Sequence, residues 1–312
     1  MPRYVPPLIG SIAAIVAFLM PHPITLHGVG IGDIGPPLVG MAQFIHGSSA
    51  YAVRLRAGRL ASYPFTTMLV LSPLLVVPIP LVAATFDGLV SFALAEAIRR
   101  KGSAWQLLLF VTPSYVAALH SVQWSPLLTA ALLVPALLPF AVVKPQIGIV
   151  LAAAGHWRTR TIIAAAGIVL LSLAVFPRWP WIWLKSGSLD TYIGRPPLLV
   201  GPGVLLLASA YAWRTWRGRC VLAMSLVPQR FFYDQLLLFV APMSPWQMAV
   251  LLATSWTAVG VSRAAGWWIP RSGDQHPLAW IIVVLGFYLP AAAIVVWNEW
   301  RRRAGLNSPG PG

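Results

Sequence analysis

Long apolar runs separated by short polar or basic turns dominate the chain. A helix that crosses a membrane needs about 20 mostly apolar residues, and several of these runs are shorter. Prolines also interrupt many of them. Short, proline-broken helices are tolerated in a membrane where protein or a cavity covers the freed backbone. The pattern therefore predicts an all-α polytopic bundle around a polar cavity, with about eight to ten spans. The runs are 8–20, 64–84, 81–98, 104–119, 126–143, 145–156, 161–177, 197–213, 220–228, 235–260 and 278–297.

The composition requires lipid as the solvent for most of this surface. Hydrophobic residues make up 58% of the chain and charged residues 9%, whereas a soluble domain carries about 25% charge. The single cysteine excludes an intrachain disulfide and a cysteine metal cluster. We interpret 8–20 as a retained first helix and not as a cleaved signal. We expect one transmembrane domain over 1–303 and a disordered Gly/Pro-rich tail over 304–312.

The charge pattern predicts an orientation. The net charge is +15, but the basic residues form short clusters between apolar runs, which argues against a nucleic-acid partner. Under the positive-inside rule the clusters lie on the cytoplasmic side and contact anionic membrane lipids. We therefore expect a multi-pass cell-membrane protein. Its segments 21–63, 120–126, 178–196 and 261–277 would lie on the outer, periplasmic or extracellular face. The pattern leaves open how many helices cross between 60 and 160. The basic clusters are 99–101, 158–160, 214–219 and 301–303.

Acidic residues are scarce, which limits the carboxylates available for chemistry. There are 7: Asp33, Asp87, Glu96, Asp190, Asp234, Asp274 and Glu299. Asp33 lies among glycines in the long segment 21–63, and long loops are often functional. The same loop mixes apolar residues with Arg54 and Arg56, which is typical of interfacial amphipathic helices. Asp33 is either a turn former or a general base that faces a membrane-level cavity.

A lysine within an apolar run is the second candidate. Lys144 precedes Pro145 and Gln146 in the stretch FAVVKPQIGIV. An ammonium at the bilayer centre costs about 2.5–3.5 kcal/mol by insertion scales, so Lys144 must snorkel, pair or face a cavity. If it faces a cavity, it would bind phosphate, and Gln146 adds a polar side chain there.

Two further polar segments interrupt the apolar pattern. The short outer loop 120–125 offers His120, Gln123 and Trp124, which could line a sugar site by hydrogen bonding and stacking. In the segment 228–235, Arg230 and Asp234 have the i,i+4 spacing of a helix ion pair. The alternative is that Arg230 binds a lipid phosphate and Asp234 orients it.

Common catalytic signatures are missing from the sequence. It has no phosphate-binding Walker loop, no HExxH, no GxSxG and no dinucleotide fingerprint. The histidines lack metal-ligand spacing. We therefore expect neither a cofactor nor a metal ion.

The order of these features resembles a known class of enzymes. An outer-loop Asp33 is followed by Gly47-x-x-x-Tyr51, by Tyr63-Pro64, by Gln123 in a short outer loop, by Lys144-Pro145-Gln146 and by Pro228-x-x-x-x-Tyr233-Asp234. This order is similar to that in bacterial polyprenyl-phosphate-sugar-dependent glycosyltransferases of the GT-C class. The likeness is greatest to the α-mannosyltransferases of phosphatidylinositol mannoside synthesis.

The resemblance implies a reaction and roles for the residues. Asp33 would be the general base that activates an acceptor hydroxyl, and the sugar, expected to be mannose, would transfer with inversion from a polyprenyl phosphate. Lys144, Arg230, Arg54 and Arg56 would bind the donor phosphate. The acceptor would be a lipid or a glycan at the outer face. Residues for the sugar or the acceptor would be His120, Gln123, Trp124, Gln146, Tyr63, Tyr233 and Asp234.

Two other readings remain open. Proline-broken helices and an intramembrane lysine also suit a transporter or flippase for a lipid-linked or anionic solute. A non-catalytic membrane subunit is the third alternative. The placement of Asp33 relative to Lys144 discriminates between the first two.

Overall fold

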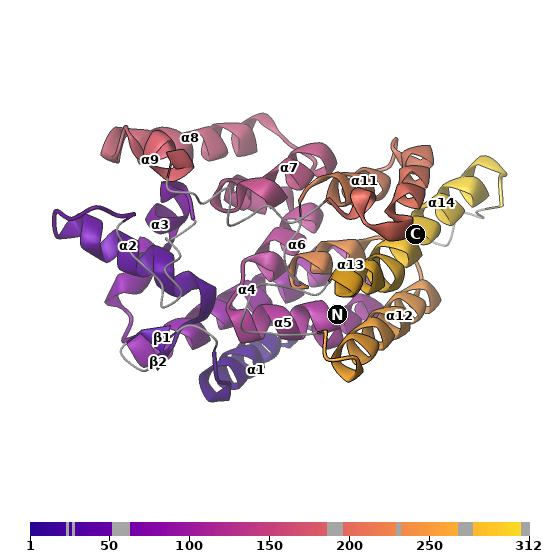
Figure 1. The fold of residues 1–312 in the computed structure, drawn as a ribbon, viewed down its shortest axis with the longest axis horizontal. Coiled ribbons are helices and arrows are strands. Elements are labelled where there is room, and N and C mark those ends of the chain that lie inside the picture. Colours follow the sequence, from indigo (N-terminus) through magenta and orange to yellow (C-terminus); the bar gives the residue numbers. More distant parts are fainter. Residues whose placement is uncertain are drawn as a thin grey trace.

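The computed structural model is helical, and the order of its elements follows the predicted runs (Figure 1). It describes residues 1–22, 25–26, 29–51, 63–185, 196–228, 232–267 and 277–306. The first part comprises α1 (Val5–Leu19), β1 (Thr25–Leu26), β2 (Val29–Gly30), the 3-10 helix η1 (Gly32–Ile34), α2 (Gly35–Ile45), α3 (Phe65–Leu71), η2 (Ser72–Val76) and α4 (Ile79–Lys101). The two short strands pair antiparallel, with Thr25 opposite Gly30 and Leu26 opposite Val29.

The central part consists of mostly short helices, most of which begin at or next to prolines. These are η3 (Ala104–Val111), α5 (Pro113–Ser121), α6 (Ser125–Leu133), η4 (Pro135–Val143), α7 (Pro145–Ala154), α8 (Thr159–Val175) and α9 (Trp179–Lys185). Proline fits the first turn of a helix because its missing N–H would be unpaired there anyway. The prolines therefore divide the apolar runs into separate helices, as predicted.

The last part of the chain completes the bundle. It comprises η5 (Pro197–Leu199), η6 (Gly201–Ala212), α11 (Trp216–Leu226), η7 (Asp234–Val240), α12 (Pro245–Ala264), α13 (Pro277–Val283), the π-helix η8 (Val284–Tyr288) and α14 (Leu289–Arg303). In the view of Figure 1, α8 and α9 lie along one edge and α1 and α12 along the opposite edge.

Two helices among the described residues have the length and apolar character of a membrane span. They are Ile79–Lys101, with 23 residues, and the continuous helix Leu278–Arg303, with 26. A third candidate is the pair Thr159–Val175 and Trp179–Lys185, which is bent by 87°. Shorter apolar helices include α1, α7 and η6. The all-helical membrane fold is thus supported, while the count of about eight to ten spans stays a prediction that depends on these shorter helices.

Close backbone packing joins α1 to α4. A Cβ added at Gly10 would lie 3.0 Å from the Gly88 carbonyl oxygen and 3.0 Å from the Phe92 Cβ. Small residues let helices approach in this way within a membrane, where packing replaces the hydrophobic effect as the driving force. The other face of α1 exposes Leu8, Ile12, Ile15 and Phe18, an apolar surface suited to lipid.

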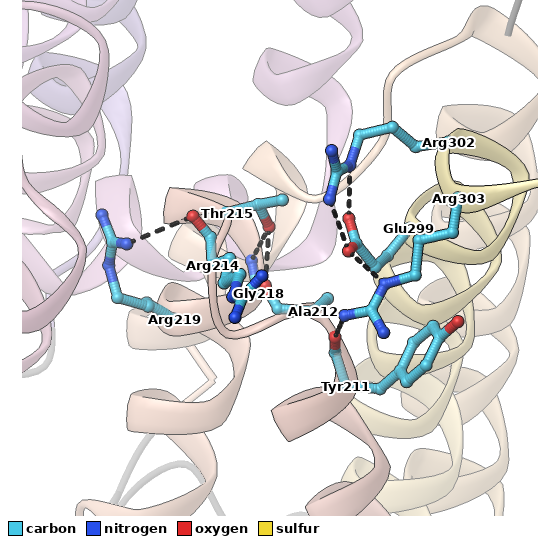
Figure 2. Close-up of polar contacts among 9 residues, drawn as sticks. All are labelled: Tyr211, Ala212, Arg214, Thr215, Gly218, Arg219, Glu299, Arg302 and Arg303. Carbon is cyan, nitrogen blue, oxygen red and sulfur yellow. Dashed lines mark hydrogen bonds and ion pairs between the residues drawn. The ribbon is translucent and has the colours of Figure 1, made fainter. Parts of the chain in front are cut away.

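Three basic segments meet at one end of the bundle. The Arg219 Nε donates to the Ala153 carbonyl at the end of α7, 2.7 Å away. Figure 2 shows Arg303 reaching from α14 to the Tyr211 carbonyl, 3.0 Å away, at the end of η6. Guanidinium groups thus satisfy carbonyls that helix ends leave free. The basic clusters near 158, 214–219 and 301–303 therefore lie at the same end of the bundle. The prediction that these loops lie on one side of the membrane requires this arrangement.

The contact between η8 and α12 yields a stability prediction. A Cβ at Gly286 would stand 2.4 Å from the Ala258 Cβ, whereas a Cβ at Gly260 on α12 would meet nothing within 4 Å. We expect Gly286→Ala to lose about 1–3 kcal/mol through overpacking, and Gly260→Ala to keep or gain stability because alanine favours helices. Thermal unfolding in detergent measures both, and equal stability of the two variants would contradict this packing.

Candidate functional site

Side chains from four distant segments converge at one place. Asp33 comes from η1, Gln123 from the turn between α5 and α6, and Lys144 from the junction of η4 and α7. Tyr233 and Asp234 come from the start of η7. Hydrogen bonds and an ion pair connect all five. The sequence analysis selected each of these residues, and the fold brings them together.

A break in the chain places Lys144 in the interior. Pro145 starts α7, so the backbone at Lys144 leaves the helical conformation, with φ −140° and ψ 82°. The carbonyls just before the break are covered, since Thr66 Oγ1 donates to the Val142 carbonyl at 2.8 Å and Thr67 Oγ1 to that of Val143. Helix α3 thus supplies the donors that a broken helix needs in an apolar environment.

A left-handed residue places Gln123. Val122 has φ +52° and is the one non-glycine residue in the described ranges with positive φ. A β-branched residue is strained there, and such strain concentrates at functional sites. The turn also lies against η1, because a Cβ on Gly32 would stand 2.5 Å from Val122 Cγ2 and 2.6 Å from the Ser121 carbonyl oxygen. Gly32 therefore lets the Asp33 segment lie directly against the Gln123 turn.

A buried ion pair forms the inner part of the site. Lys144 Nζ lies 2.7 Å from Asp234 Oδ1, and both side chains are almost fully buried. Ser125 Oγ donates to the same oxygen at 2.9 Å. The ammonium also lies 4.4 Å from the centre of the Tyr233 ring, in a cation–π contact. Asp234 therefore neutralises Lys144, and Ser125 and Tyr233 hold the pair in place.

The Gln123 side chain connects this pair to Asp33. Its Oε1 accepts from Lys144 Nζ at 3.3 Å, and its Nε2 donates to Asp33 Oδ2. Because lysine only donates and an ionised carboxylate only accepts, the amide can take only this orientation. Tyr233 OH also donates to Asp33 Oδ2, at 3.4 Å. Oδ2 thus accepts two hydrogen bonds, whereas the structure shows no hydrogen bond from a described residue to Oδ1.

The environment makes Asp33 more basic than an ordinary aspartate. Burial raises the pKa of Asp33 to about 6, although Lys144, Tyr233 and Gln123 oppose the increase. Asp33 nevertheless keeps part of its surface exposed, whereas Gln123, Lys144 and Asp234 are buried. Among the connected groups, Asp33 is therefore the one that an incoming molecule can reach, with a pKa suited to proton transfer near neutrality.

The remaining predicted residues lie apart from this network or outside the described residues. Trp124 is buried against Phe86, with ring centroids 4.9 Å apart, so hydrophobic packing holds it. Tyr63 is buried in the main core at the start of α3. Gln146 is half-buried, and no hydrogen bond to it from a described residue is seen. His120 contributes its backbone carbonyl to a contact with His22. Arg54, Arg56 and Arg230 lie outside the described residues.

Other described acids have different surroundings. Glu96 pairs with Arg99 and Arg100 at the end of α4, and Glu299 with Arg302 and Arg303 at the end of α14 (Figure 2). Asp87 is fully buried in α4, and within the described part of the chain neither of its carboxyl oxygens has a hydrogen-bond partner. Only Asp33 and Asp234 share a site among the described acids, and those residues include no group of three or more side chains arranged for a metal ion.

Sequence reasoning missed Ser125 as a member of the site. It begins α6 directly after the Gln123-Trp124 pair, so its place in the same short polar loop was a usable signal. His22 was missed as well.

Comparison with known proteins adds no identity: no family model, no curated protein and no solved structure matches this chain.

The buried pair yields a stability prediction. Removing one partner leaves an uncompensated buried charge, which costs about 3–5 kcal/mol, whereas replacing both partners by uncharged groups is often close to neutral. We therefore expect Lys144→Met and Asp234→Asn each to lower the unfolding temperature strongly. The double variant should recover most of the loss. A double variant as unstable as the sum of the single variants would show that the two side chains do not interact.

The contact of Gly32 with the Gln123 turn yields a second prediction. Gly32 and Gly47 both have positive φ, +55° and +78°, but only a Cβ at Gly32 would collide with a neighbour. Alanine should therefore cost about 1–2 kcal/mol of backbone strain at either position, with a further loss at Gly32 from the collision. Thermal unfolding of Gly32→Ala against Gly47→Ala separates the two effects, and equal losses would contradict the close approach.

Proposed function

We propose that the chain is a membrane glycosyltransferase that moves a sugar, expected to be mannose, from a polyprenyl phosphate to a lipid or glycan hydroxyl. The observation that carries the proposal is the Asp33 carboxylate. It is partly exposed, it has a raised pKa, and it is hydrogen-bonded through Gln123 to a buried Lys144–Asp234 pair. An oriented, partly exposed carboxylate with a raised pKa is suited to act as a general base.

In this proposal one oxygen of Asp33 takes the proton. Asp33 Oδ2 accepts from Gln123 and Tyr233, so Oδ1 would take the proton from the acceptor hydroxyl. The acceptor oxygen then forms a bond to the anomeric carbon while the bond from that carbon to the phosphate oxygen breaks. The electron pair of that bond leaves with the polyprenyl phosphate, and attack from the opposite side inverts the configuration.

The developing charge on the leaving phosphate needs positive groups nearby. Lys144 is already paired with Asp234 at 2.7 Å. In this proposal it therefore contributes through its field and through Gln123, while Arg230, Arg54 and Arg56 bind the phosphate directly. Arg230 is proposed for this role because it is close to Tyr233 and Asp234 in sequence.

The predicted orientation in the membrane is compatible with sugar transfer at the outer face. In the proposal the basic end formed by α7, α11 and α14 faces the cytoplasm, under the positive-inside rule. The site would then open toward the outer face of a multi-pass cell-membrane protein, where a polyprenyl-phosphate sugar and not a sugar nucleotide is the donor. The shorter apolar helices would complete the predicted spans.

A transporter or flippase for a lipid-linked or anionic solute is the second candidate, and one observation favours it. Buried pairs of opposite charge between proline-broken helices are also typical of transport pathways. Such a carrier would bind the donor lipid and move it without cleaving the sugar–phosphate bond.

The central prediction concerns Asp33. We expect Asp33→Asn to lower transfer from radiolabelled polyprenyl-phosphate mannose by about 10²–10⁴-fold, because the amide cannot accept the proton. Donor binding should persist. Glu96→Gln is the matched control, since Glu96 pairs with arginines at a helix end away from the site, and this variant should keep wild-type transfer. Transfer by Asp33→Asn at the wild-type rate would refute the base assignment.

The raised pKa adds a pH dependence. The base must be ionised, so transfer should fall as the pH drops through about 6. If purified wild-type protein binds the donor but transfers nothing at any pH, the carrier is the better interpretation.

A further inference from the structure

His22 lies between two backbone carbonyls. Its Nδ1 is 2.9 Å from the His120 carbonyl oxygen, and its Nε2 is 2.8 Å from that of Ala17. The side chain is 9% exposed, so water does not replace either contact. Both partners are acceptors only. A neutral imidazole carries one N–H, so two acceptors require the ring to carry both protons.

Helix dipoles favour a positive charge at this place. Ala17 lies in the last turn of α1, and His120 lies in the last turn of α5. Carbonyls at the C-terminal end of a helix carry partial negative charge, which stabilises a cation. A histidinium between two such ends therefore satisfies orphan carbonyls of both helices.

We propose that His22, as an imidazolium, is a positioning residue for Asp33 and Gln123. The His120 carbonyl that it binds is three residues before Gln123, at the end of α5. On the other side, a Cβ on Gly30 would lie 3.0 Å from the His22 Cβ, and Gly30 is three residues before Asp33. His22 thus joins the end of α1 to both segments that form the Asp33–Gln123 hydrogen bond. Loss of one ring proton would release one carbonyl and loosen this junction.

The ionisable groups around the ring do not supply its counter-charge. Helix α1 contains no ionisable residue. Neither Asp33 of the site nor Asp87 of α4 forms an ion pair with His22. Helix α4 is considered because it packs against β2. On α5, the Tyr115 hydroxyl is hydrogen-bonded to Ser91. Burial lowers the pKa of the His120 ring, with His22 and then Arg263 adding to the decrease.

The consequence for activity rests on the proposed function. Transfer would need Asp33 ionised, which sets an acid limb near pH 6, and His22 protonated, which sets an alkaline limb. The pH–rate profile of the wild type should therefore be bell-shaped. Losing a hydrogen bond to a charged group should lower transfer by roughly tenfold or more on the alkaline side.

The test compares pH profiles of wild type, His22→Gln and His46→Gln. Glutamine cannot change its charge, and its single nitrogen cannot stand at the positions of both ring nitrogens, so His22→Gln should lose the alkaline limb and keep the acid limb. His46 is exposed at the end of α2 and serves as the matched control, with a profile like that of the wild type. A His22→Gln profile that retains the alkaline limb would overturn the proposal.

A second measurement does not depend on catalysis. In ¹⁵N spectra of histidine-labelled wild-type protein in detergent, one ring should show both nitrogens protonated, and this signal should disappear on raising the pH. The unfolding temperature of the protein should fall over the same pH range, because the protonated ring provides the contact. If these changes occur without any sugar transfer, the positioning role stands and the glycosyltransferase proposal fails. If every ring shows a single protonated nitrogen while transfer is active, the positioning role fails alone.

Discussion

The ion pair between Lys144 and Asp234 is the interaction on which the site depends. It joins the junction of η4 and α7 to the start of η7, and both charges are buried. Buried charges are costly unless they are paired and hydrogen-bonded. Ser125 and Gln123 complete that bonding. Because the Gln123 amide also binds Asp33, the position of the Asp33 carboxylate follows from how the buried lysine is neutralised.

Broken helices make this arrangement possible. A continuous helix through residues 135–154 would direct successive side chains around its axis, whereas the break at Pro145 lets Lys144 extend into the interior. The cost is freed carbonyls, which Thr66 and Thr67 of α3 cover. The strained Val122 has a comparable role for Gln123. Irregular backbone occurs in this protein where a polar side chain must enter an apolar bundle.

The sequence predicts the helical membrane fold and the residues of the site, but not their connections. Asp33, Gln123, Lys144 and Asp234 stand out as polar positions among apolar runs. Nothing in local spacing predicts that Lys144 pairs with Asp234, 90 residues away; the local pattern favoured Arg230 for that carboxylate. Trp124 looks like a stacking surface in a polar loop, yet its ring packs on Phe86. His22 carries no sequence signal, because its partners are backbone carbonyls.

The distribution of arginine distinguishes Asp33 from Glu96 and Glu299 among the described acids. Glu96 and Glu299 each accept hydrogen bonds from two arginines, so both carboxylates are held in ion pairs. Asp33 instead binds an amide and a phenol, neutral donors that orient a carboxylate without neutralising it. Lys144, the cation hydrogen-bonded to Gln123, is compensated by Asp234. A carboxylate held by neutral groups keeps both its proton affinity and a free oxygen, which is the combination that proton abstraction requires.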